Sequence, residues 1–239
     1  MSERKQVGVF LIATNKYKQF VQPLLNSIDK NFLLKHDVKI FLFTDEPTEY
    51  KYKGDVLQVK IEPYKFPYAT LYRYKIITDN ALLFDQLDYI YYLDVDMEVV
   101  SEVGEEIFSP FLLAVKHPGF FHGGWGSPNY PTGTTTFLPV DQRKTYYAGG
   151  FQGGNAKEYL KCTKELSERI TQDEVRGIIP EWHDETAWNW YLNSEQAPLV
   201  SLSPAYCMVE QLHLRQAWKI DKIEPKIVAL AKNHKELRA

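Results

Sequence analysis

Asp94 and Asp96 are the two carboxylates whose spacing in this chain most directly suggests chemistry. They flank Val95 and directly follow the apolar run of residues 89–93. A Mg²⁺ or Mn²⁺ site commonly takes one or two carboxylates from the protein and its remaining ligands from substrate phosphates. The pair therefore suggests a metal-assisted site for a phosphate-bearing substrate. The alternative is a merely acidic loop after a strand, because three-residue patterns also arise by chance.

The segment Trp182-His183-Asp184-Glu185 is a second dense cluster of polar groups. A tryptophan offers a flat apolar face to a sugar ring, and carboxylates can bind hydroxyl groups or act as base or nucleophile. The structural alternative makes Trp182 a core residue and Asp184 the cap of the helix that follows. Neighbouring carboxylates normally point in different directions, so an acid and base pair that flanks one glycosidic bond is not favoured.

Three other segments allow both a functional and a structural interpretation. The glycine pairs at 149–150 and 153–154 either permit close approach of the backbone to a ligand or mark a turn before a helix. His117 stands before Pro-Gly, so it is either a hydrogen-bonded turn residue or a ligand contact. The cations at residues 232–238 form either a solvated end or a flap that closes over a diphosphate.

The elements expected around these residues bring several of them to one edge of a sheet. Apolar patterns predict strands at 7–13, 38–43, 56–61 and 89–93, and helices at 17–32 and 69–84. Alternating strands and helices are typical of a doubly wound parallel sheet, in which ligands bind beyond the carboxyl ends of the strands. Thr14 and Asp94 follow two such ends, so we expect them to face one crevice.

The second half of the chain is less regular than the first. Residues 117–136 predict a long loop or a set of short strands, and helices are expected at 155–170 and 185–192. In the helix at 69–84, the residues expected to face inward are Leu71, Tyr74, Ile77, Leu82 and Leu83. Since no repeat or linker is found, we expect one domain with two lobes.

Composition excludes several classes of protein. The chain has 239 residues, of which 44% are hydrophobic and 25% charged, and this balance excludes a disordered chain. Its net charge of −3 argues against a nucleic-acid partner. Cys162 and Cys207 predict free thiols in a reducing compartment. Neither a signal peptide nor a stretch of ~20 apolar residues is found, so we expect a soluble, cytoplasmic protein without a transmembrane segment.

Taken together, several motifs make the chain resemble glycosyltransferase family 6, the group of the ABO blood-group transferases and α-1,3-galactosyltransferases. They are Phe43-Thr44-Asp45, Asp94-Val95-Asp96-Met97-Glu98, His117-Pro118-Gly119-Phe120, Tyr146-Tyr147-Ala148-Gly149-Gly150-Phe151-Gln152-Gly153-Gly154, Trp182-His183-Asp184-Glu185, Leu202-Ser203-Pro204-Ala205-Tyr206 and Lys232-Asn233-His234. The resemblance runs from about residue 7 to 238. Vertebrate members carry an anchor and stem that this sequence does not show, so we expect it to resemble the short bacterial or phage members instead.

The resemblance implies an α/β fold of the GT-A type. Residues 1–239 would form a single catalytic domain. About 1–100 would be a Rossmann-like nucleotide-binding half with a central mixed sheet flanked by helices. About 101–239 would be the acceptor-binding half with a C-terminal flap. The implied reaction is retaining transfer of N-acetylgalactosamine, or of galactose, from a UDP-sugar in α-1,3 linkage to a terminal β-galactoside. The implied acceptor is an oligosaccharide or lipopolysaccharide-type glycan, and the implied cofactor is Mn²⁺ or Mg²⁺.

The resemblance also implies roles for individual residues. Glu185 matches the catalytic residue and also an acceptor contact, together with His117 and Trp182, and Asp94 and Asp96 match the metal ligands. The residues that match the donor site are Ile12, Ala13, Thr14, Tyr17, Arg73, Asp94, Val95, Asp96, Ala148, Gly149, Gly150, Asp184, Lys232 and Arg238. Among these, residues 12–14 and 17 match the uridine pocket, and Lys232 and Arg238 match cations that bind the diphosphate.

Departures from the family pattern define what to expect of donor, metal and acceptor. Several bacterial relatives replace the acidic pair by Asn-x-Asn and work without metal, whereas Asp94 and Asp96 predict metal dependence here. Gly150 leaves room for an acetamido group, which favours UDP-N-acetylgalactosamine as donor. Val209 and Glu210 stand where vertebrate members carry an acceptor-binding Asp, and the loop at 121–137 is poorly matched. The need for a fucose on the acceptor therefore stays open.

Two other classes of protein compete with a transferase. An Asp-x-Asp phosphohydrolase would carry Thr or Val two residues after the second Asp, near the first strand, but Glu98 holds that place and the pair lies mid-chain. A carbohydrate-binding module without catalysis is suggested by the 14% aromatic content and by Trp182. Such a module would bind glycans without needing a nucleotide.

Overall fold

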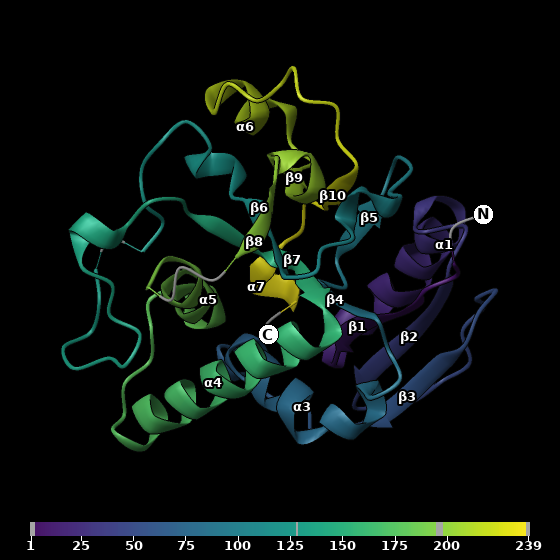
Figure 1. Ribbon diagram of the computed structural model, residues 1–239, viewed down its shortest axis with the longest axis horizontal. Coiled ribbons are helices and arrows are strands. Elements are labelled where there is room, and N and C mark those ends of the chain that lie inside the picture. The colour runs from purple at the N-terminus through teal and green to yellow at the C-terminus, as the bar shows by residue number, and fades with distance from the viewer. Residues whose placement is uncertain (1–2, 128, 195–197, 238–239) are drawn as a thin grey trace.

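A seven-stranded mixed sheet forms the centre of the protein, with strand order β3-β2-β1-β4-β7-β6-β8 (Figure 1). The computed structural model describes residues 3–127, 129–194 and 198–237. The strands are β1 (Gln6–Ala13), β2 (Asp37–Thr44), β3 (Val56–Lys60), β4 (Tyr89–Leu93), β6 (Leu112–Lys116), β7 (Tyr147–Asn155) and β8 (Leu199–Leu202). β3, β2, β1 and β4 pair in parallel, as expected, whereas β7 is antiparallel to both β4 and β6.

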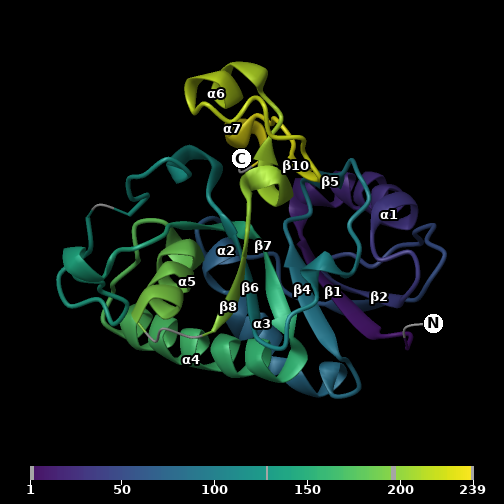
Figure 2. The ribbon, with the colours of Figure 1, turned by 45° about the horizontal axis from the view of Figure 1, so that its top comes forward.

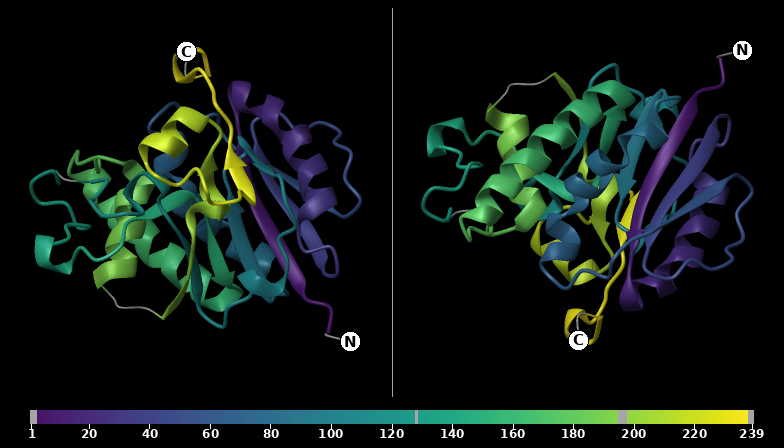
Figure 3. Two further views of the ribbon diagram at one scale, coloured as in Figure 1. Left: turned by 90° about the horizontal axis from the view of Figure 1, so that it is seen from above. Right: turned by 90° about the horizontal axis from the view of Figure 1, so that it is seen from below.

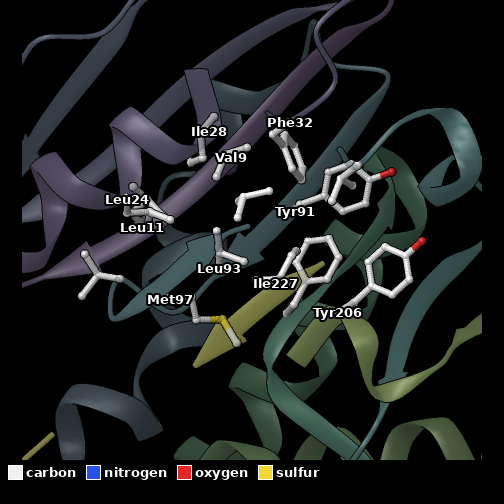
Figure 4. Packing of buried hydrophobic residues seen from close by; sticks show 14 of the residues in the cluster. Val9, Leu11, Leu24, Ile28, Phe32, Tyr91, Leu93, Met97, Tyr206 and Ile227 are labelled. Atoms are coloured by element: carbon white, nitrogen blue, oxygen red, sulfur yellow. The ribbon is translucent and has the colours of Figure 1, made fainter. Parts of the chain in front are cut away.

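Apolar side chains cover both faces of this sheet. On one face, alternate residues of β1 pack with the helix α1 (Val21–Asn31), as Val9, Leu11, Leu24 and Ile28 show in Figure 4. On the other face, Phe10 packs with the helices α3 (Arg73–Asp79), α4 (Ala156–Val175) and α5 (His183–Ser194). Because side chains of a strand alternate between faces, one strand contributes to both cores. The result is a three-layer α/β domain (Figure 2).

The segment expected as one helix at 69–84 is broken into three pieces. They are α2 (Tyr68–Leu71), α3 and a 3₁₀ helix at Ala81–Phe84. The side-chain amide of Asn80 donates to the carbonyl of Ile76 and ends α3, so the helical period does not continue. Leu82 and Leu83 are therefore 85% and 39% exposed, and the prediction that they face inward was wrong. Phe84 is buried in their place.

The glycine pairs lie inside β7, not in a turn before a helix. Gly153 and Gly154 have φ angles of 154° and 126°, which L residues with side chains rarely adopt. A Cβ on Gly153 would lie 2.1 Å from the carbonyl oxygen of Ile90 in β4, so β7 packs there only without a side chain. The following helix begins instead with Asn155, whose side chain accepts hydrogen bonds from two backbone N–H groups of its first turn.

A second, three-stranded sheet lies against the first. It contains β5 (Met97–Val99), β10 (Ile227–Ala229) and β9 (Met208–Val209), in that order. The last short helices are α6 (Leu212–Ala217) and α7 (His234–Leu237). Figure 3 shows this C-terminal part on one side of the molecule and α4 on the opposite side. The sequence patterns did not indicate this sheet.

The remaining expectations concern the loop, the thiols and membrane spans. Between β6 and β7 the described residues form a long irregular segment with short 3₁₀ helices. Of the two alternatives for residues 117–136, this is the long loop and not the set of short strands. Cys162 and Cys207 are free and buried. In the described ranges, no helix has the length and apolar character needed to cross a membrane.

Candidate active site

The carboxyl ends of β1 and β4 lie next to each other, because the two strands are parallel neighbours. Asp94 follows β4, and Ile12, Ala13 and Thr14 lie at the end of β1. Ala13 and Thr14 are buried, and a 3₁₀ helix at Asn15–Phe20 places Tyr17, half-buried, just beyond them. This is the edge where parallel sheets bind ligands.

One guanidinium group, that of Arg73, joins both acidic clusters. Its Nη2 lies 2.9 Å from Oδ1 of Asp94, and its Nη1 lies 2.9 Å from Oδ2 of Asp184. Nη1 also donates to the carbonyl of Gly149 at 2.6 Å. Burial alone would lower the pKa of Arg73, but Asp184, Tyr92 and Asp94 raise it well above its ordinary value. Arg73 is thus a permanently charged bridge between segments that lie far apart in the sequence.

The described residues that hold Asp94 bind one of its two oxygens. Oδ1 accepts hydrogen bonds from Tyr92 Oη at 2.5 Å and from Arg73 Nη2. The guanidinium of Arg73 lies 3.7 Å from the ring centroid of Tyr92, which fixes the three groups relative to one another. Within the described part of the chain, Oδ2 of Asp94 accepts no hydrogen bond, so it remains available to a ligand. The side chain of Val95, by contrast, is buried in the core.

Asp96 is nearly buried and forms an ion pair with the C-terminal residue Lys232. Burial and the nearby charge of Asp94 raise the pKa of Asp96, while Lys232 opposes that rise. Backbone pairing brings the tail there, because β10 pairs with β5, which directly follows Asp96, and Leu230 N–H donates to the Asp96 carbonyl at 3.0 Å. The other predicted tail cation, Arg238, lies outside the described residues.

The carboxylate of Glu185 has a hydrogen-bond donor on each oxygen. Tyr146 Oη donates to Oε1 at 2.8 Å, and the backbone N–H of Gly149 donates to Oε2 at 2.8 Å. Burial raises the pKa of Glu185, while both donors act to lower it. Burial also raises the pKa of Asp184 to about 7, against the effect of Arg73. The two neighbouring carboxylates thus face different partners, as we expected.

A ladder of side chains fixes helix α5 against the chain that leads into β7. Glu185 binds the N–H of Gly149, Asn189 binds both backbone groups of Tyr147, and Asn193 binds both backbone groups of Thr145. Four residues of a helix rise about 6 Å, close to the advance of two strand residues, ~6.6 Å, so the two elements stay in register. The Glu-x₃-Asn-x₃-Asn spacing was visible in the sequence, but its meaning required the position of β7.

The other two predicted acceptor residues, besides Glu185, lie beside this ladder. His117 Nδ1 accepts a hydrogen bond from Gly119 N–H at 3.1 Å, and burial lowers the pKa of His117 to about 4, so it is neutral. Its ring lies 5.6 Å from the ring centroid of Tyr146. Trp182 is 52% exposed and donates to the carbonyl of Gly126, so the alternative of a core tryptophan is wrong.

Two glycines of β7 let the acidic side chains pack closely against the backbone. A Cβ on Gly150 would lie 3.0 Å from Asp94 Oδ2, and a Cβ on Gly149 would lie 3.4 Å from Glu185 Oε2. Ala148 precedes them in β7 and is buried. Gly149 and Gly150 therefore permit close approach to both carboxylates. Glu210, in contrast, accepts a hydrogen bond from Ala231 N–H and has a structural role in fixing the tail.

The acidic pair suits a divalent cation that is shared with a ligand. Among the described residues, the cations that pair with Asp94, Asp96 and Asp184 are Arg73 and Lys232, so full ionisation of these three carboxylates and of Glu185 leaves an excess of negative charge. The described residues contain no cluster of three His, Cys, Asp or Glu side chains able to enclose a metal. Asp94 and Asp96 would supply two carboxylates, and phosphates or water would supply the other ligands, as is common for Mg²⁺ and Mn²⁺.

Comparison with known proteins identifies the family of the chain. The family model of glycosyltransferase family 6 matches residues 2–239. The rat histo-blood group ABO system transferase 1 is 30% identical over 243 residues, which cover 97% of this chain and 68% of the rat protein. The chicken globoside alpha-1,3-N-acetylgalactosaminyltransferase 1 is 26% identical over 216 residues, which cover 84% of this chain and 61% of that protein.

A bacterial relative matches more of its own length. The O-antigen biosynthesis glycosyltransferase WbnI of Escherichia coli is 25% identical over 201 residues, which cover 82% of this chain and 85% of that protein. The resemblance inferred from the motifs is confirmed, and the parallel strands with flanking helices agree with a GT-A type fold. Family membership implies a sugar donor and a glycan acceptor. The chain belongs to glycosyltransferase family 6 and is a hexosyltransferase.

Proposed function

We propose that this protein is a retaining transferase that moves N-acetylgalactosamine from its UDP-sugar, in α-1,3 linkage, to a terminal β-galactoside. The acceptor would be an oligosaccharide or a lipopolysaccharide-type glycan. The chicken relative is named for α-1,3 transfer of N-acetylgalactosamine, and the E. coli relative for O-antigen biosynthesis. The observation that carries the proposal is that Arg73 bridges Asp94 and Asp184, and thereby joins a metal-type acidic pair to the neighbour of Glu185.

The nucleotide half of the donor would occupy the end of the parallel strands. Residues 12–14 and Tyr17 would contact uridine, and Val95 would contribute its backbone at the same edge. A Mn²⁺ or Mg²⁺ ion held by Asp94 and Asp96 would neutralise charge that develops on the diphosphate leaving group. Lys232 and Arg238 would add cationic groups to the phosphates. Preorganised charge is most effective where it meets charge that develops in the transition state.

The sugar would lie between the two carboxylates of α5. Arg73 and Asp184 would bind its hydroxyl groups, and Glu185 would lie at the anomeric carbon. Glu185 would either attack that carbon, breaking its bond to the diphosphate oxygen, or stabilise an oxocarbenium-like state while the acceptor enters from the leaving-group face. Both routes need Glu185 as an anion, and the hydrogen bonds from Tyr146 and Gly149 N–H favour that anion.

Donor choice would depend on the residues that precede Phe151. Gly150 has no side chain, and a Cβ there would meet Asp94 Oδ2 and Met97 Cε at 3.0 Å. With no side chain at position 150, an acetamido group would lie against the backbone once the ends of these two side chains move aside, whereas a larger residue at this position would obstruct it. Because one small group supports only ~10- to 200-fold discrimination, some use of UDP-galactose is expected. A ratio of kcat/KM values that favours UDP-galactose would contradict the proposed donor and indicate an α-1,3-galactosyltransferase instead.

The proposed reaction is tested by a panel of donors and acceptors with analysis of the product linkage. We expect an α-1,3-linked N-acetylgalactosamine on a terminal β-galactoside. Acceptors with and without a neighbouring fucose are tested in separate reactions, which shows whether the fucose is required. Titration with UDP and Mn²⁺ separates a transferase from a carbohydrate-binding module, because a module without catalysis should not respond. Release of phosphate from simple esters without sugar transfer would favour a phosphohydrolase.

A further inference from the structure

A cavity of about 410 Å³ adjoins the predicted acceptor side, separate from the acidic cluster. Its size falls within the range of small-molecule pockets. Its walls combine three aromatic residues with three cationic ones, namely Phe120, Phe121, Trp125, Lys116, Arg143 and Lys144. None of the roles assigned so far uses these six residues.

The charge of this cavity is positive although the chain as a whole carries −3. No Asp or Glu lines it. The Lys116 ammonium lies 5.8 Å from the ring centroid of Phe121, and the Arg143 guanidinium lies 5.8 Å from that of Trp125, so both cations lie against aromatic rings that line the cavity. Among the side chains that the structure describes, Lys116 and Lys144 form no ion pair, unlike Lys18, which pairs with Asp45.

One tyrosine connects this cavity to the reacting centre. Tyr146 lines the cavity, and its hydroxyl donates to Oε1 of Glu185. Its ring packs against Trp125 and Phe120, with centroids 5.0 and 5.1 Å apart. A ligand in the cavity would therefore lie one aromatic ring away from the predicted catalytic carboxylate. In the proposed function, with the terminal galactoside at Glu185, the next sugar of the acceptor would reach this cavity.

We propose that this cavity binds an anionic group on the acceptor, so that the preferred acceptor is an acidic oligosaccharide. The group is a carboxylate or a phosphate on the sugar next to the terminal β-galactoside. Lys116, Arg143 and Lys144 would bind the anion through charge-assisted hydrogen bonds, and the aromatic rings would contact the apolar face of the sugar. This inference rests on the proposed function, because it names the acceptor class of that same site.

The size of the effect follows from solvent exposure. Lys144 is exposed, and Lys116 and Arg143 are half-buried, so water and salt weaken each ion pair. Together the three cations should favour an acidic acceptor by about 10-fold in kcat/KM. This preference should shrink as ionic strength rises, because the Debye length falls from about 10 Å at 0.1 M salt to about 3 Å at 1 M.

The experiment compares three disaccharide acceptors with the same terminal β-galactosyl linkage. Their second sugars are glucose, glucuronic acid and glucose 6-phosphate. The kcat/KM of each is measured for the wild type, for the double variant Lys116→Gln/Lys144→Gln, and for Lys157→Gln. Lys157 is an exposed residue at the start of α4 that does not line the cavity, and it serves as the matched control.

The expected result is a preference of about 10-fold for at least one acidic acceptor in the wild type and in Lys157→Gln. In the double variant, the kcat/KM for an acidic acceptor divided by that for the neutral acceptor should be close to one. Preference for the glucuronate or for the phosphate identifies the anion. Equal use of all three acceptors by the wild type, or a preference that the double variant retains, overturns the inference.

Calorimetric binding of galactosyl-glucuronate and galactosyl-glucose 6-phosphate separates failure of this inference from failure of the proposed function. Binding that is weakened in the double variant, without transfer to any acceptor, would support the cavity as an anion site and contradict the proposed reaction. Transfer to the neutral acceptor without any acidic preference would contradict only the cavity. If neither transfer nor binding occurs, both proposals are wrong.

Discussion

Lys232 and Asp96, which lie 136 positions apart in the chain, form an ion pair at Oδ2 of the aspartate. The contact is not left to two flexible side chains, since β10 pairs with β5 and holds the backbone of the tail beside the acidic pair. Lys232 therefore occupies an oxygen of Asp96 that could also bind the proposed metal. Binding of a metal at that oxygen and the contact with Lys232 should exclude each other.

Lys232→Ala should change the affinities for metal and nucleotide in opposite directions. Removal of the ammonium frees Asp96, so the affinity for Mn²⁺ alone should rise, by about 5-fold for loss of one partly screened competitor. The affinity for UDP in the presence of Mn²⁺ should fall, because a cation for the diphosphate is lost. Calorimetric titrations measure both effects. Lys235→Ala is the matched control, because Lys235 is exposed on the same tail. Parallel loss of both affinities would show that Lys232 only supports the fold.

Removal of divalent metal should abolish transfer. In excess chelator we expect kcat to fall by at least about 100-fold, because two carboxylates then face the diphosphate without compensation. Added Mn²⁺ should restore activity in the wild type but not in Asp94→Asn, whose Oδ2 is the oxygen left available in the structure. Full activity in chelator would contradict the metal role of both aspartates.

Glu185→Gln should lower kcat by about 100-fold or more while the affinity for the donor changes little. The amide keeps the shape of the carboxylate but lacks the negative charge that either proposed route requires. Single-turnover rates and donor titrations check this. Glu168→Gln, at an exposed position of α4, is the matched control. An unchanged kcat would remove Glu185 from the chemistry.

Tyr146→Phe should act through Glu185. The phenol lowers the pKa of Glu185 by donating to Oε1, so its loss should raise that pKa. The ionised fraction then falls at a given low pH, and the acidic limb of the kcat profile moves to higher pH. The plateau should fall about 10-fold, as for loss of one hydrogen bond to a charged group. Tyr147→Phe is the control, since Tyr147 directly follows Tyr146 in the sequence but its hydroxyl forms no hydrogen bond with a described residue. A shift of the limb in both variants would argue against this role.

Asp184 should make stability depend on pH. Its pKa is raised to about 7 by burial, from an ordinary value near 3.9, so between these values the folded state holds a proton that the unfolded state has lost. The contribution of Asp184 to the free energy of unfolding is therefore present at low pH and is lost as pH rises to about 7. In denaturant unfolding, the free energy of unfolding of the wild type should fall relative to that of Asp184→Asn as pH rises over this range. A difference independent of pH would show that Arg73 keeps Asp184 ionised throughout.

Local patterns in the sequence predicted much of the first half of the fold. β1, β2, β3 and β4 lie within one or two residues of the expected strands, because buried parallel strands are short apolar runs. The prediction of one continuous helix at 69–84 was wrong for a local reason. Asn80 interrupts a helical spacing that continues in the sequence, and Leu82 and Leu83 then point to solvent.

The candidate site was predicted residue by residue but not as an arrangement. The types and spacing of Asp94, Asp96, Asp184 and Glu185 indicated chemistry, and the motifs indicated the family. The sequence could not show that Tyr146 donates to Glu185. That contact depends on β7 running antiparallel beside β4, and on Asn189 and Asn193 holding α5 in register with it.

By itself, then, the sequence determined the family, the parallel core and the groups available for reaction, because these depend on residue types and short spacings. Only the tertiary structure decided which groups share partners. Arg73 joins Asp94 to Asp184, and Lys232 reaches Asp96, because sheet pairing brings together segments that are distant in the chain. The order of strands in a sheet is a property of long-range packing, which no local spacing of residues encodes.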